Sequence, residues 1–178
     1  MMELTIVNSV WRGSLDMHVD LHAFESRIED AMLGEIKSVK HQQKQPEQLV
    51  IKFNDGSTML MFKTGKFRIM GKVDELSAHC NVLLVTSLLH AYPEVQLQTM
   101  TVVYAYPYRI LLDKLSLLIK CHYDLENFPA VQITKYKPIH VNVFASGKVI
   151  ICGIKDLHDA KNIETELDNI IMCTFLIN

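Results

Sequence analysis

The side chains most often used in catalysis and metal binding are scattered along this chain of 178 residues. Of its eight histidines, His18 and His22 stand at helical spacing, but no H-E-x-x-H motif or cysteine pair accompanies them. Four cysteines are too dispersed for a C-x-x-C zinc knuckle, and we interpret them as free, buried thiols in a reducing compartment. They are Cys80, Cys121, Cys152 and Cys173. Without a phosphate loop or a nucleophile elbow either, we expect no enzyme activity, no metal and no cofactor.

The charge of the chain is distributed unevenly along the sequence. A net charge of -2 with 49% hydrophobic and 21% charged residues is typical of a globular protein and excludes a bulk polycation. However, residues 34–72 carry a balance of +5 and residues 132–155 carry +4, which leaves -11 for the rest. We therefore expect one face suited to phosphate and another suited to protein partners.

The amino terminus has no basic start followed by a long apolar run, and no apolar run approaches the ~18 residues of a membrane span. We expect a soluble intracellular protein with no membrane partner, located in the nucleus if the host is eukaryotic.

An internal repeat is the strongest feature of the sequence. Residues 61–71 and 143–153 match in register, with identical residues that are each separated by 82 positions. The identical pairs include Phe62 and Phe144, Gly65 and Gly147, Lys66 and Lys148, and Gly71 and Gly153. Such self-similarity indicates a tandem duplication, with one repeat over residues 1–92 and a second over 93–178.

Both copies show the same order of predicted elements. Each opens with a strand (5–11 or 98–104), continues with a short helix (20–32 or 109–120), and ends with a long helix (74–92 or 156–172). Between the helices lie a strand-like run (48–53 or 130–136) and the repeated hairpin, whose glycines stand where a tight turn needs positive φ. This order predicts an α+β fold with an antiparallel sheet.

The second repeat resembles the TATA-box-binding protein family. The resemblance rests on Phe128-Pro129, on Lys137-Pro138, and on the run Phe144-Ala145-Ser146-Gly147-Lys148, at the separations found in that family. The first repeat is similar but weaker, and the match extends over roughly residues 7–171. It implies a tandem duplication forming a curved, saddle-shaped antiparallel sheet, with a concave face that sits on DNA and helices on the convex face.

The resemblance also implies which residues contact DNA. The family inserts two pairs of Phe between base steps as wedges, and Phe62, Phe128 and Phe144 match these positions, while Gln45 stands before Pro46 where Phe would be expected. Asn8 and Val10 match minor-groove contacts in the opening strand. The remaining implied contacts, on the hairpins, are Leu60, Lys66, Arg68, Lys148 and Ile150.

Several positions depart from the family pattern. Met70 and Cys152 replace the family's Thr, Arg68 replaces a Val, and the phosphate-contacting Arg positions read Ile51 and Thr134, with Lys52 and Lys135 beside them. Equal spacing from Phe128 places Leu97 at the second Asn position and Thr99 at the Val position, with Gln98 and Thr101 as other candidates. These replacements put TATA specificity in question and suggest a fast-evolving or viral lineage.

Partner contacts follow from the same resemblance. Asp124, Glu126 and Asn127 occupy the loop that docks a general transcription factor IIB-like protein in the family, and 34–45 forms a longer loop that contacts DNA, RNA or a new protein. An exposed apolar concave face also favours self-association when unbound. Two functions fit: an initiation factor that binds and bends double-stranded promoter DNA, or a protein-interaction scaffold that binds DNA weakly or not at all.

Overall fold

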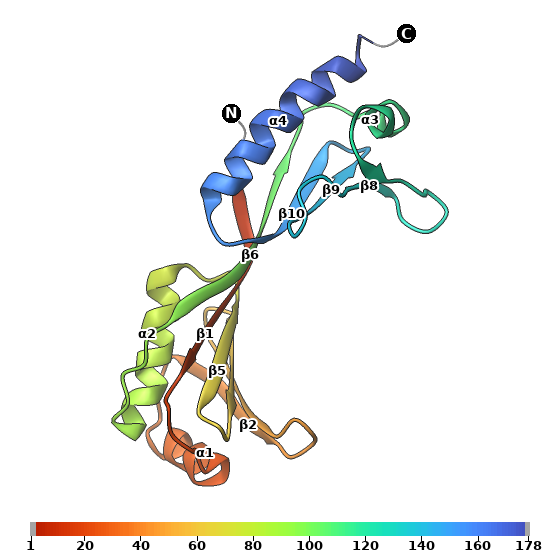
Figure 1. Ribbon diagram of the computed structural model, residues 1–178. Helices are drawn as coiled ribbons and strands as arrows, with labels where there is room; N and C mark the ends of the chain where they lie inside the picture. The colour runs from red at the N-terminus through yellow and green to blue at the C-terminus, as the bar shows by residue number, and fades with distance from the viewer. Residues whose placement is uncertain (1–2, 177–178) are drawn as a thin grey trace. The chain divides into compact units, whose positions relative to one another are not determined.

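The computed structural model describes residues 3–176, which form two compact units (Figure 1). The N-terminal unit comprises residues 8–98, and the C-terminal unit comprises residues 99–176 together with 3–7. The division falls inside the two opening strands of the repeats, β1 and β6. Each unit is an α+β structure, as the sequence predicts.

The N-terminal unit contains five strands in the order β2-β3-β4-β5-β1, and every described pair is antiparallel. Its elements in chain order are β1 (Thr5–Ser14), α1 (Leu21–Asp30), β2 (Ile36–Gln42), β3 (Gln48–Phe53), β4 (Thr58–Phe62), β5 (Lys66–Gly71), α2 (Glu75–Thr86) and the short 3-10 helix η1 (Ser87–Leu89).

The C-terminal unit repeats this arrangement with the order β6-β10-β9-β8-β7, again antiparallel. Its elements are β6 (Gln96–Ala105), α3 (Leu112–Leu118), β7 (Cys121–His122), β8 (Ala130–Ile133), β9 (His140–Phe144), β10 (Lys148–Ile154) and α4 (Leu157–Thr174). In each unit the same two hairpins therefore follow the opening strand and the short helix.

Aspartates fix the starts of three helices. Asp20, Asp74 and Asp156 are the N-cap residues of α1, α2 and α4, and their side chains accept hydrogen bonds from backbone N–H groups of the first turn. These groups have no partner inside the helix, so a capping carboxylate satisfies them and complements the helix dipole. The long predicted helices thus begin within one residue of their predicted starts.

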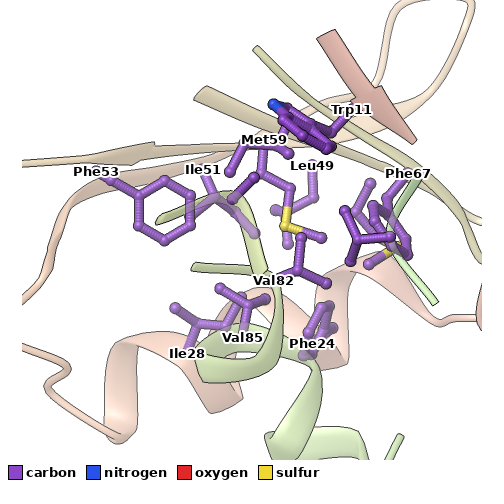
Figure 2. Packing of buried hydrophobic residues seen from close by; sticks show 14 of the residues in the cluster. Trp11, Phe24, Ile28, Leu49, Ile51, Phe53, Met59, Phe67, Val82 and Val85 are labelled. Atoms are coloured by element: carbon purple, nitrogen blue, oxygen red, sulfur yellow. The ribbon is translucent and has the colours of Figure 1, made fainter. Parts of the chain in front are cut away.

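The core of the N-terminal unit lies between its sheet and its helices (Figure 2). Apolar side chains alternate along β3, β4 and β5, so that one set points toward Phe24 and Ile28 of α1 and toward Val82 and Val85 of α2. The buried strand residues are Trp11, Leu49, Ile51, Phe53, Met59, Met61, Phe67 and Ile69. The strand residues that alternate with these point to the other face of the sheet, which is therefore open to solvent.

The repeated hairpin glycines have a positive φ, as the sequence predicts, and also a close neighbour. Gly65 (φ 79°) and Gly147 (φ 93°) end the β4–β5 and β9–β10 turns. A Cβ at Gly65 would lie 2.2 Å from the carbonyl oxygen of Met17, and one at Gly147 would lie 2.6 Å from that of Tyr106. Glycine is therefore required here for backbone conformation and for space.

Two sequence expectations differ from the structure. Residues 36–42 form the edge strand β2, so the expected loop over 34–45 is wrong for most of its length and shrinks to the segment between β2 and β3. The outer edge of β2 is covered at His41, whose N–H donates to Glu25 Oε1 of α1 at 2.8 Å.

All four cysteines are free, but Cys80 and Cys173 are exposed rather than buried, because they lie on the solvent sides of α2 and α4.

Within residues 3–176, no helix combines the length and apolar character needed to cross a membrane, and no three histidine, cysteine or acidic side chains gather as a metal site.

Candidate nucleic-acid interface

One face of the sheet in each unit carries no helix, and we call these surfaces the open faces. In the N-terminal unit, strand residues that alternate with the buried ones are half-buried or exposed. This open face consists of Asn8, Val10, Arg12, Ser14, Ser38, Lys40, Gln42, Gln48, Val50, Lys52, Thr58, Leu60, Phe62, Lys66, Arg68 and Met70.

The open face of the C-terminal unit follows from the same alternation. Its members are Thr99, Thr101, Val103, Ala105, His122, Ala130, Gln132, His140, Asn142, Phe144, Lys148, Ile150 and Cys152. Ala130 is buried, and the other strand positions are half-buried or exposed.

The open face of the N-terminal unit is strongly basic. Five of its strand positions carry Arg or Lys and none carries Asp or Glu. The five cations are Arg12, Lys40, Lys52, Lys66 and Arg68. None of them forms an ion pair with another residue in the described range. An array of uncompensated cations on a sheet surface is suited to phosphate, because each contact releases a counterion from the nucleic acid.

Two of these cations are adjacent. Arg12 of β1 is the register partner of Arg68 of β5. Together with Lys66 they line a hollow of about 900 Å³, which Asp16 and Glu94 also line. Like charges directly opposite one another destabilise a strand pair, so a bound anion would relieve this repulsion.

The open face of the C-terminal unit has less charge and more aromatic surface. Lys148 is its one Lys or Arg among the described strand positions. Phe144, at the end of β9, packs edge to face against Phe128 of the β7–β8 loop, with ring centroids 6.0 Å apart and an interplanar angle of 62°. Both rings are only half-buried. Paired, half-buried apolar rings at the end of a sheet are similar in kind to the apolar side chains that minor-groove-binding proteins insert between base steps.

Strand register identifies the counterpart of Phe128 in the N-terminal unit. Gln48 pairs with Phe62 as Ala130 pairs with Phe144, and Phe128 precedes Ala130 by two residues. The residue two before Gln48 is Pro46, so the alignment of Phe128 with Gln45 is wrong by one residue. Pro46, Gln45 and Phe62 line a hollow of about 420 Å³. The N-terminal unit thus has one ring and an open space in place of two rings.

The loop that carries Pro46 is held by charge. The Glu47 carboxylate forms an ion pair with the Lys63 ammonium and, through Oε1, lies 3.0 Å from His41 Nε2. Lys63, and to a lesser degree His41, keep the pKa of Glu47 below its usual range. This cluster connects the β2–β3 loop to β2 and to the β4–β5 turn.

The loop that carries Phe128 is held by an aspartate. Asp124 Oδ2 accepts from Asn127 Nδ2 at 2.6 Å, its Oδ1 accepts from the Glu126 N–H at 3.1 Å, and its carbonyl accepts from the Phe128 N–H at 2.9 Å. The Asn127 hydrogen bond is the main reason why the pKa of Asp124 lies below its usual range. Asp124 and Asn127, predicted as partner contacts, thus bind each other, while Glu126 and Leu125 are exposed.

The residues predicted to contact DNA gather on these surfaces. Asn8, Val10, Leu60, Phe62, Lys66 and Arg68 lie on the open face of the N-terminal unit, and Phe144, Lys148 and Ile150 lie on that of the C-terminal unit. Gln45 and Phe128 lie in the loops beside them. None of these residues is fully buried.

Two sequence alignments are corrected by strand register. Thr101 pairs with Cys152 as Val10 pairs with Met70, so Thr101 corresponds to Val10 and Thr99 to Asn8. The equal spacing that placed Leu97 at the Asn position is wrong, because the two copies differ in length between the opening strand and the hairpin. Ile51, aligned with a phosphate contact, is 0% exposed in the core, and its neighbour Lys52 occupies the open face instead.

Sequence reasoning missed Arg12. The period of two in Asn8, Val10 and Arg12 would have placed it on the open face with the residues already chosen. Arg12 corresponds to Val103 in the other unit, and Arg68 corresponds to Ile150.

The model of the family "Transcription factor TFIID (or TATA-binding protein, TBP)" matches residues 3–90 and 94–173, nearly all of the chain. The chain belongs to the TATA-binding protein family. Members of this family are DNA-binding transcription factors, and this chain is not an enzyme.

Similar proteins are found among archaea. The chain is 28% identical over 170 residues to the TATA-box-binding protein of Methanococcus aeolicus, covering 89% of this chain and 88% of that protein. It is 28% identical over 150 residues to the TATA-box-binding protein of Thermococcus sibiricus, covering 75% and 81%. The solved structure of Methanococcus jannaschii TBP matches with a TM-score of 0.79 at 25% identity, over 96% of this chain and 98% of that chain. This match confirms the predicted two-repeat α+β fold of the TATA-binding protein family.

Proposed function

We propose that this TATA-binding protein family member is an initiation factor that binds AT-rich promoter DNA through the minor groove and bends it. The relatives named as TATA-box-binding proteins support the choice of DNA sequence. The observation that carries the proposal is the pair of open faces, which carry unpaired cations and half-buried aromatic rings and bear no acidic side chain at any described strand position.

The chemistry of the open faces suits this groove. A·T pairs present only the acceptors N3 and O2 in the minor groove, and the side chain of Asn8 and the hydroxyls of Thr99 and Thr101 supply donors. The cations supply contacts to the phosphates that border the groove. Phe128 and Phe144 supply an apolar wedge, whose insertion between base steps kinks DNA toward the major groove.

The other surfaces would bind proteins. The helices and connecting segments carry the acidic balance of the chain, and the loop with Asp124, Glu126 and Asn127 is the proposed contact for a factor IIB-like protein. The half-exposed apolar residues of the open faces favour self-association without DNA. Such a factor acts inside the cell, at the site of transcription.

The test is a fluorescence bending assay on an AT-rich duplex labelled at both ends, run at several salt concentrations. We expect binding that weakens steeply with salt and brings the two labels closer together. A Phe128→Ala, Phe144→Ala variant should lose most of the bending. Phe175→Ala is the matched control, because Phe175 is also an exposed ring (49%) but follows α4, away from the open faces.

The scaffold function predicts the opposite result. If neither duplex bending nor salt-sensitive binding is detected, and the Phe128→Ala, Phe144→Ala variant behaves as the wild type does, the DNA-binding proposal is wrong. Binding to a IIB-like protein without DNA would then favour the scaffold.

A further inference from the structure

The two repeats provide a matched comparison of their wedge positions. Phe144 and Phe62 are separated by 82 residues, end corresponding strands and are both half-buried. Their surroundings differ. Phe144 has a second ring beside it, whereas Phe62 lies beside the hollow of about 420 Å³ that Pro46 and Gln45 also line.

The pair in the C-terminal unit is organised before any ligand binds. Edge-to-face contact with Phe128 restricts both rings, and the loop of Phe128 is fixed by hydrogen bonds to Asp124. Ala130, which pairs with Phe144, is only 1% exposed, so the rings stand on a closed surface. A restricted pair loses little conformational entropy when it enters a base step.

The single ring in the N-terminal unit lacks this support. No aromatic partner of Phe62 exists among the described residues, and the space where a second ring would stand is open. A lone ring replaces less of the stacking that a separated base step loses. The same open face instead carries five unpaired cations, which bind phosphate without requiring any base step to open.

We propose that the protein unstacks DNA at one base step only, the step entered by Phe128 and Phe144, and that the N-terminal unit holds its part of the site by charge on stacked DNA. This inference rests on the proposed function, since it requires DNA binding. It adds a functional asymmetry between the two repeats, although the hairpin phenylalanine is identical in both.

The experiment uses the full chain and a set of AT-rich duplexes in which 2-aminopurine replaces adenine at each position in turn. The fluorescence of 2-aminopurine rises when its neighbours unstack. With the wild type we expect a several-fold rise confined to the positions that flank a single base step. Phe144→Ala should abolish this rise and weaken binding roughly ten-fold or more, in line with the loss of base–aromatic contacts. Phe128→Ala should act in the same direction.

Phe62→Ala is the matched variant, with the same atoms removed from the corresponding strand. It should leave the fluorescence maximum in place and change the affinity by less than about three-fold. If Phe62→Ala removes a maximum that Phe144→Ala leaves in place, both units unstack DNA and the inference is wrong. It is also wrong if binding produces no maximum at all.

Failure of the proposed function gives a different result. In that case none of the duplexes is bound, as fluorescence anisotropy of an end label shows independently of 2-aminopurine. Circular dichroism melts of all three variants show whether a variant has lost the fluorescence signal because it is unfolded. If Phe144→Ala is unfolded, Phe128→Ala provides the test in its place.

Discussion

Arg12 and Arg68 lie directly opposite each other on β1 and β5, whereas the corresponding pair in the C-terminal unit is Val103 and Ile150. The same strand geometry thus holds two cations in one repeat and two aliphatic side chains in the other. Because the backbone arrangement is shared, the difference in side chains makes this position cationic on one open face and apolar on the other.

The first prediction concerns the salt dependence of DNA binding. Arg68→Ile gives the N-terminal unit the residue of its counterpart, and removing one phosphate contact should reduce the slope of log K against log salt by about 0.9. Ile150→Arg should increase the slope by a similar amount. Arg27→Ile, on the exposed side of α1, is the control for charge alone. An equal change in slope for the Arg27 variant would show that net charge, and not the open face, sets the salt dependence.

The second prediction concerns a buried hydrogen-bond chain behind the opening strand. Trp11 Nε1 donates to Ser9 Oγ at 3.0 Å, and Ser9 Oγ donates to the Val73 carbonyl at 2.6 Å. Ser9→Ala leaves the indole N–H and the carbonyl without this partner, and should lower the free energy of unfolding by about 1–3 kcal/mol. Urea denaturation measures the loss. Ser14→Ala, at the end of β1, should cost less than about 0.5 kcal/mol. Trp11→Phe should lower the free energy of unfolding less in the Ser9→Ala background than in the wild type, because the indole N–H has already lost its acceptor there.

The third prediction distinguishes two costs of replacing a turn glycine, the steric clash of the new Cβ and the strain of a positive φ. Gly65→Ala and Gly56→Ala both place alanine at positive φ (79° and 87°), which costs about 1–2 kcal/mol in each case. A Cβ at Gly56 meets nothing within 4 Å, whereas one at Gly65 would lie 2.2 Å from the Met17 carbonyl oxygen. We therefore expect Gly65→Ala to lower the melting temperature clearly more than Gly56→Ala. Equal effects would mean that the β1–α1 connection moves away at no cost.

The fourth prediction concerns pH. The Asn127 side chain lowers the pKa of Asp124, so the folded loop is stabilised above the ordinary carboxyl pKa, and this stabilisation is lost as the pH falls through the lowered value. Carbon-13 NMR titration of the Asp124 carboxyl should show a higher pKa in Asn127→Ala than in the wild type. The signals of the Phe128 ring should shift over the same pH range, because the two residues share one turn. An unchanged Asp124 pKa in Asn127→Ala would exclude this hydrogen bond as the cause.

Local sequence was sufficient for most elements. The strand-like run over 48–53 predicts β3 with its observed bounds, and the helical patterns over 74–92 and 156–172 begin within one residue of α2 and α4. Both signals depend on neighbouring residues only, so they are readable without tertiary structure.

Register across the sheet could not be read in this way. The copies differ by nine residues between the opening strand and the hairpin, as the pairs Val10–Met70 and Thr101–Cys152 show. The sequence does not say where the extra residues lie, so Leu97 was aligned instead of Thr99. The contact between Phe128 and Phe144 and the hollow beside Phe62 likewise depend on how loops fold over strand ends.

The hydrogen bond from the β2 backbone to Glu25 bears on the resistance of the protein to aggregation. A long edge strand with free N–H and C=O groups is a template for pairing with other chains and for amyloid growth. Here the Glu25 carboxylate of α1 accepts a hydrogen bond from the N–H of His41. The exposed Lys37 and Lys40 also place like charges along the same strand. Both features make this edge of the sheet less available for pairing with other chains, while one face of the same sheet stays open.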